Sequence, residues 1–94
     1  MKLRIIDYGW GIDRRSGERS ESVCAEVNFH VKEGALPPVG PEKKVFKITK
    51  VGEGSVSVWL SDKQGEATIS IGKPYEYRPM SIDGGHYYRF ELEE

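Results

Sequence analysis

Alternation of apolar and polar residues is the clearest pattern in the chain, and it is longest over residues 22–32. Apolar residues occupy every second position there, which is the period of a β-strand with one dry and one wet face. A helix would scatter the same residues around its axis. The segment therefore predicts a strand whose core-facing residues are Val23, Ala25, Val27, Phe29 and Val31.

Shorter segments with the same period predict further strands in the rest of the chain. Tyr75 and Tyr77, which lie between two prolines, predict one more short strand. No stretch has the period of a helix. The core-facing residues predicted for the shorter segments are Leu3, Ile5, Phe46, Ile48, Val56, Val58, Leu60, Ala67, Ile69, Ile71, Tyr88, Phe90 and Leu92.

Turn signals separate these segments and indicate the architecture. Residues 52–54 and 61–65 have the composition of short hairpin loops. Residues 34–43 hold three prolines and two glycines, and they predict a passage of the chain from one sheet to another. The sequence therefore predicts an all-β fold in a single domain of residues 1–94. We expect an antiparallel β-sandwich of about seven short strands with an immunoglobulin-like architecture, or a small barrel as the alternative.

The charge balance argues against nucleic acid as a partner. The chain has 14 basic and 15 acidic residues, for a net charge of −1, whereas phosphate binding needs a basic surplus. The single cysteine, Cys24, excludes an intramolecular disulfide and a cysteine-rich zinc cluster. Its polar phase within residues 22–32 predicts an exposed, inert thiol, which fits a reducing compartment.

The N-terminal segment bears on localisation. Its apolar run ends after Ile6 and is too short for the core of a signal peptide. No segment reaches the length of a membrane span. These features predict a cytoplasmic protein without a membrane partner, and a secreted one if the sequence is a trimmed product.

The stretch SIDGGHYYRF, residues 81–90, gathers an acid, two glycines, a histidine and two tyrosines. Asp83-Gly84-Gly85 is a turn signal, because glycine adopts positive φ at little cost. His86 follows in phase with Tyr88, so we expect it to point toward the core. A catalytic or metal site with Asp83 needs a second group of residues nearby, and the sequence indicates none. We therefore expect no catalytic residue, no metal and no cofactor.

Three aromatic residues fall outside the core-facing phase: Trp59, Trp10 and Tyr87. Large rings on an outer face favour contact with a partner. An equally weighted alternative is that Trp59 is a packing residue, covered by the loop at 34–43 or by a second sheet. The sequence thus predicts these three as candidate binding residues.

Two functions are compatible with these features. The first is a domain that is not an enzyme and binds another protein, or a second copy of itself, through aromatic residues or open edge strands. The second is a carbohydrate-binding module whose aromatic rings stack on sugars. A small hydrolase or metal-dependent enzyme that uses His86 and Asp83 is a third, less favoured alternative.

Overall fold

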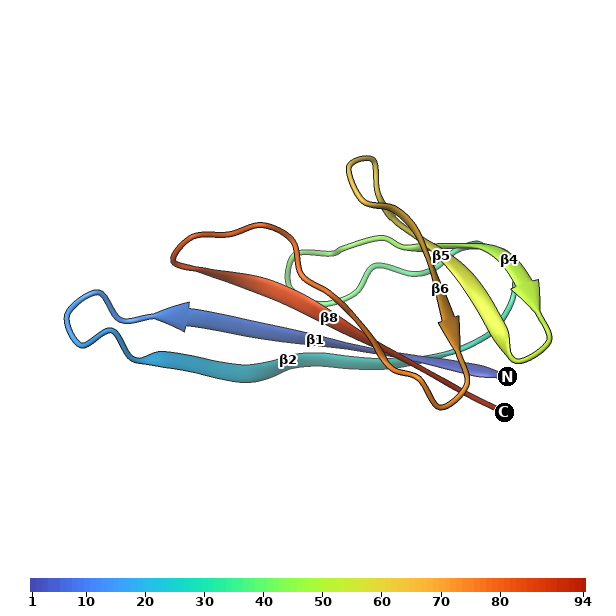
Figure 1. Cartoon of the computed structure of the whole chain (residues 1–94), viewed down its shortest axis with the longest axis horizontal. Helices are drawn as coiled ribbons and strands as arrows, with labels where there is room; N and C mark the ends of the chain where they lie inside the picture. The colour runs from blue at the N-terminus through green and yellow to red at the C-terminus, as the bar shows by residue number, and fades with distance from the viewer.

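The chain folds into two antiparallel β-sheets and contains no helix, as the computed structural model of all 94 residues shows (Figure 1). The first sheet has the strand order β2-β1-β8-β7 and the second has the order β3-β4-β5-β6. The strands of the first sheet are β1 (Lys2–Ile12), β2 (Arg19–His30), β7 (Tyr75–Tyr77) and β8 (Gly84–Glu93). Those of the second are β3 (Gly34–Ala35), β4 (Lys47–Gly52), β5 (Ser55–Ser61) and β6 (Gly65–Ser70).

The predicted all-β class is confirmed, whereas the small-barrel alternative is wrong because the two sheets do not close on each other. The hairpin loops expected at residues 52–54 and 61–65 join β4 to β5 and β5 to β6. The short strand at Tyr75 and Tyr77 is β7. The fold has no helix that is long and apolar enough to cross a membrane.

One cluster of 14 buried residues forms the core, and Phe46 is one of its largest fully buried side chains. Its ring makes edge-to-face contacts with Tyr88 and Phe90 at centroid distances of 5.2 and 5.0 Å, a favourable geometry for aromatic pairs. All of the predicted core-facing residues except Val23 and Ala25 belong to this cluster or pack against it. The cluster also contains Leu36, Val39 and Tyr77, which were not assigned to the core from the sequence.

The first sheet is much longer than the second, so the molecule measures 48 × 25 × 20 Å. In Figure 1 the β1–β2 hairpin extends well beyond β4, β5 and β6, and both termini lie at the opposite end. The chain passes between the sheets at residues 31–33, earlier than the sequence suggests. The following segment forms a tight hairpin, with paired backbone hydrogen bonds of 2.8 and 3.0 Å between Val39 and Lys44.

A β-bulge interrupts the pairing of β1 with β2. Asp7 lies opposite Ala25 and Tyr8 lies opposite Val23, so Cys24 is an extra residue in β2. A bulge of this kind reverses the phase of the strand beyond it. The predicted burial of Val23 is therefore wrong, since this side chain is 58% exposed. Cys24 is exposed as predicted, but it lies on the inner face of the sheet, above Gly9.

Candidate functional site

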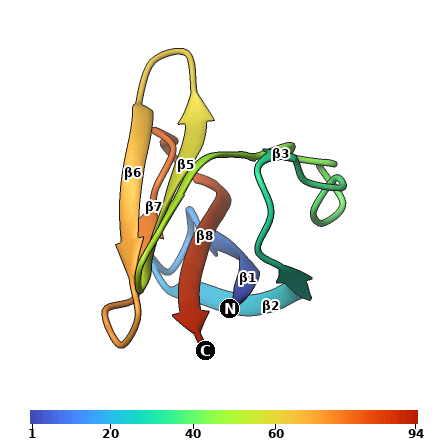
Figure 2. The same cartoon turned by 90° about the vertical axis from the view of Figure 1, so that its right-hand side faces the viewer.

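The three aromatic candidates do not share one surface. Trp10 of β1 and Tyr87 of β8 have the outward phase in the first sheet, whereas Trp59 belongs to β5 of the second sheet. Figure 2 labels these three strands. The Trp10 ring is half-buried, and the Arg19 guanidinium lies 4.9 Å from its centre. A single flat platform formed by all three rings is therefore not present in this fold.

Tyr87 is covered although it faces outward. It is only 7% exposed, because Tyr8 stacks on it at 4.8 Å and the Arg78 guanidinium lies 4.0 Å from its ring centre. Its hydroxyl donates a hydrogen bond to Glu21. This hydrogen bond lowers the pKa of Glu21, while burial raises the pKa of Tyr87. The residue thus anchors a polar cluster on the outer face of the first sheet.

Trp59 is half-buried on the outer face of β5. In register it lies between Lys47 of β4 and Glu66 of β6. The ammonium groups of Lys47 and Lys44 lie 5.0 and 5.9 Å from its ring centre, within the range of cation–π attraction. Its surroundings are therefore charged and not apolar.

The strongest cluster of reactive groups is centred on Asp7, a residue that the sequence argument did not select. Asp7 follows Leu3 and Ile5 in the same phase of β1, so its side chain points inward and is 0% exposed. Its Oδ1 lies 2.6 Å from Nδ1 of His86. Its Oδ2 is buried and has no hydrogen-bond partner. The sequence does carry a signal for the Asp7 site, because Asp7 places a carboxylate in the core-facing phase of Leu3 and Ile5.

His86 points toward the core side, as predicted, and joins two carboxylates. Besides the contact with Asp7, its Nε2 lies 3.5 Å from Oε1 of Glu42, at the tip of the Val39–Lys44 hairpin. Asp83, which the less favoured enzyme alternative joined with His86, pairs instead with Arg14. The other histidine, His30, is exposed and lies opposite Lys2 at the far end of β1.

Cys24 belongs to the same cluster because Gly9 has no side chain. A Cβ atom at Gly9 would lie 2.8 Å from Cys24 Sγ and 3.8 Å from His86 Cε1. Ligand atoms of Asp7, Cys24 and His86 all lie within 4.8 Å of one another. Strands β1, β2 and β8 thus each contribute one reactive side chain to a single point on the inner face.

An open pocket of about 530 Å³ leads to this point. Of the two carboxylates in its lining, Glu42 lies beside His86, whereas Glu21 pairs with Arg19 and accepts the hydrogen bond from Tyr87. The lining residues are Gly9, Trp10, Gly11, Ser20, Glu21, Ser22, Cys24, Glu42, Gly85 and His86.

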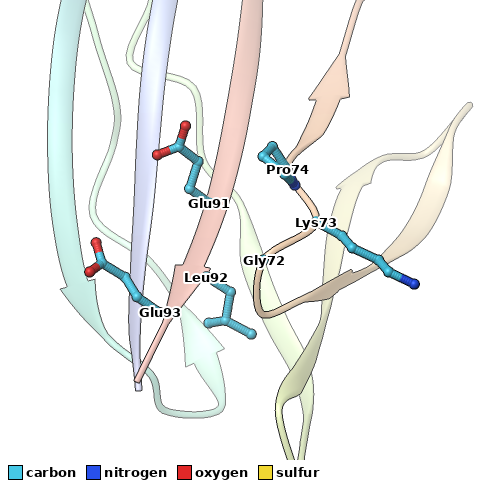
Figure 3. Close-up of a pocket in the computed structure, with 6 residues that line it drawn as sticks. All are labelled: Gly72, Lys73, Pro74, Glu91, Leu92 and Glu93. Atoms are coloured by element: carbon cyan, nitrogen blue, oxygen red, sulfur yellow. The ribbon is translucent and has the colours of Figure 1, made fainter.

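Another open pocket, of about 380 Å³, lies where the β6–β7 connection meets the end of β8 (Figure 3). Its polar side chains diverge. Glu91 and Glu93 point to one side of β8, and Lys73 extends to the other. This pocket has no group of converging polar residues.

Strand β2 has an open edge along its whole length. It contains twelve residues, pairs only with β1, and includes no lysine or proline, two residue types that normally block such edges. Other edge strands are shorter. β7 has three residues between Pro74 and Pro79, β3 has two, and β6 has six.

Comparison of the chain with protein-family models, with curated proteins and with solved structures gave no match.

The packing of Gly40 on Asp7 generates a stability prediction. Gly40 has a φ of 74°, and a Cβ atom there would overlap Asp7 Oδ2. Gly17 has the same φ, but nothing lies within 4 Å of its Cβ position. We expect Gly17→Ala to cost about 1 kcal/mol of unfolding free energy from backbone strain alone. Gly40→Ala should cost about 2 kcal/mol more, because the hairpin must move off Asp7.

Urea unfolding of both variants beside the unmodified chain measures this difference. Equal destabilisation by the two substitutions would show that the hairpin does not press on Asp7.

Tyr88 generates a prediction for alkaline pH. Burial, followed by the negative charge of Asp7, raises the pKa of this phenol, and its hydroxyl has no hydrogen-bond partner. The pKa of Tyr88 is higher in the folded chain than in the unfolded chain, where it is about 10. Its contribution to the free energy of unfolding is therefore complete below about pH 10 and is lost as the pH rises further. Tyr88→Phe should be at least as stable as the unmodified chain at pH 7.

Above about pH 10 the unmodified chain should lose about 1.4 kcal/mol per pH unit more than Tyr88→Phe. Unfolding free energies of both proteins measured between pH 7 and 11 check this. Parallel pH profiles would contradict the assignment of Tyr88 as a buried neutral phenol.

Proposed function

We propose that this domain is a protein-interaction module that binds an extended segment of another polypeptide along the open edge of β2. The observation that carries this proposal is the twelve-residue edge strand, which pairs on one side only. Strand addition to such an edge forms a new row of main-chain hydrogen bonds, and alternate side chains of the added strand supply specificity.

The register identifies which backbone groups would receive the partner. Val31 donates its N–H to the Met1 carbonyl at 3.1 Å, so residues 1 and 31 form a hydrogen-bonded pair. Because such pairs alternate along an antiparallel ladder, Glu26, Asn28 and His30 direct their backbone N–H and C=O groups away from β1. These three residues form the regular part of the edge, on the C-terminal side of the bulge at Cys24.

Side chains beside this edge support recognition of a polypeptide. Val23 is an exposed apolar residue in β2 itself. Trp10 lies opposite Glu21 of β2, so its half-buried ring borders the same edge. A second copy of this chain is one suitable partner, because two β2 strands can pair antiparallel about a twofold axis.

The structure gives less support to carbohydrate binding and to an immunoglobulin-like architecture. Carbohydrate binding calls for an open aromatic platform, and the candidate rings are divided between two sheets or covered. The immunoglobulin-like architecture stays a prediction. A constant-type immunoglobulin domain divides its strands as ABED and CFG, whereas β3 to β6 follow one another within one sheet here.

Asn28→Pro tests the edge directly. Asn28 is exposed and its N–H points to solvent, so proline removes a donor from the edge without breaking the ladder with β1. Asn28→Ser is the matched control because it keeps that donor. Sedimentation equilibrium of the pure proteins first measures self-association. We expect Asn28→Pro to weaken it at least about tenfold, and Asn28→Ser to leave it unchanged.

If the unmodified chain is a monomer at all concentrations, the same three proteins serve as bait in lysate of the source organism. A protein retained by the unmodified chain and by Asn28→Ser, but lost with Asn28→Pro, supports the proposal. Equal retention by all three rules out the β2 edge. Trp59→Ala in a fourth lane tests whether the Trp59 surface is the binding site.

A further inference from the structure

We propose that Cys24, His86 and Glu42 form a binding site for a transition-metal cation, with Zn²⁺ as the best fit, and that Asp7 positions His86 within it. This inference is independent of the role proposed for β2. It rests on the contacts, burial and charge of these four residues.

The buried carboxylate of Asp7 is the first observation. The side chain is 0% exposed, Oδ2 has no hydrogen-bond partner, and its only ion-pair partner is His86. Buried carboxylates in proteins are paired with cations or take part in metal sites. No lysine or arginine pairs with Asp7. The charge around it therefore calls for a cation held next to His86.

The contact between Asp7 and His86 is the second observation. At 2.6 Å from Oδ1, Nδ1 of His86 is engaged by a hydrogen bond, which leaves Nε2 directed away from Asp7. Histidines that bind a metal commonly donate their other ring N–H to a carboxylate, which fixes the ring and makes the free nitrogen a better ligand. Asp7 is thus a positioning residue, and His86 Nε2 is the ligand.

The spacing of the ligand atoms is the third observation. Two nitrogen or oxygen atoms bound about 2.0 Å from a tetrahedral ion are about 3.3 Å apart. The separation between His86 Nε2 and Glu42 Oε1 is 3.5 Å. Cys24 lies on the same side of the sheet, with its Sγ within 4.8 Å of a His86 ring nitrogen and of an Asp7 oxygen. Completion of the site requires the Cys24 and Glu42 side chains to rotate so that Sγ and Oε1 meet the ion bound at His86 Nε2.

The ligand types identify the metal class. A thiolate, an imidazole and a carboxylate favour Zn²⁺ over Mg²⁺ or Ca²⁺, which prefer oxygen ligands alone. Three protein ligands leave the fourth tetrahedral position to water or to a ligand from the open pocket. The carboxylate of Glu42, which lies beside His86 Nε2, supplies the negative charge that attracts the cation.

Titration of the reduced, metal-free full chain with Co²⁺ tests this site. Thiolate ligation to Co²⁺ gives an intense near-ultraviolet charge-transfer band, and tetrahedral geometry gives visible bands. We expect both at one Co²⁺ per chain, with their loss when Zn²⁺ displaces Co²⁺. Absence of both bands at millimolar Co²⁺ overturns the proposal and leaves His86 as a structural link between two carboxylates.

Four variants assign the roles. Cys24→Ser should abolish the charge-transfer band, and His86→Gln and Glu42→Gln should each weaken Co²⁺ binding at least about tenfold. Asp7→Asn should weaken it about 10- to 100-fold while keeping the charge-transfer band, as expected of a residue that acts through the ligand. Glu42 and Cys24 are exposed, so their variants should fold; circular dichroism checks this for all four.

The controls are His30→Gln and Glu53→Gln, which change the other histidine and an exposed hairpin glutamate. Neither should alter the affinity. If His30→Gln weakens binding as much as His86→Gln, or if Cys24→Ser keeps the charge-transfer band, the assigned site is wrong.

Discussion

Burial of the Asp7 carboxylate is the constraint on which the arrangement of β1, β8 and the Val39–Lys44 hairpin depends. Asp7 occupies an inward position of β1 that the pattern of Leu3 and Ile5 assigns to the core. A charge in that position is costly unless a partner compensates it. His86 supplies that partner from β8, and the hairpin that carries Gly40 closes over the carboxylate. The contact between Asp7 and His86 therefore joins β1 to β8 by a polar interaction, whereas the core between the two sheets is held by apolar packing.

Much of the fold follows from alternation in the sequence, because a half-buried strand needs an apolar residue at every second position. No pattern of apolar and polar residues in the sequence indicates the bulge at Cys24. It depends on the pairing of β2 with β1, and it moved Val23 outward and Cys24 onto the inner face. His86 was placed on the correct side by its phase with Tyr88. Glu42 could not be assigned to it, since only the tertiary path of the Val39–Lys44 hairpin brings the two together.

Strand β2 contributes to both proposals. Its regular part, up to the bulge, presents unpaired backbone groups at the edge of the first sheet. The bulge itself turns a thiol toward Asp7 and His86. The two proposed sites are therefore adjacent parts of one strand.

Residue-resolved amide hydrogen exchange of the monomeric chain tests the open edge of β2 most directly. The amides of Ala25, Val27 and Phe29 donate toward β1, so they should exchange slowly, whereas those of Glu26, Asn28 and His30 should exchange fast. This alternation should disappear when a partner strand binds. Slow exchange of Glu26, Asn28 and His30 in the isolated monomer would contradict the account, because it would mean that the edge is already covered by the chain itself.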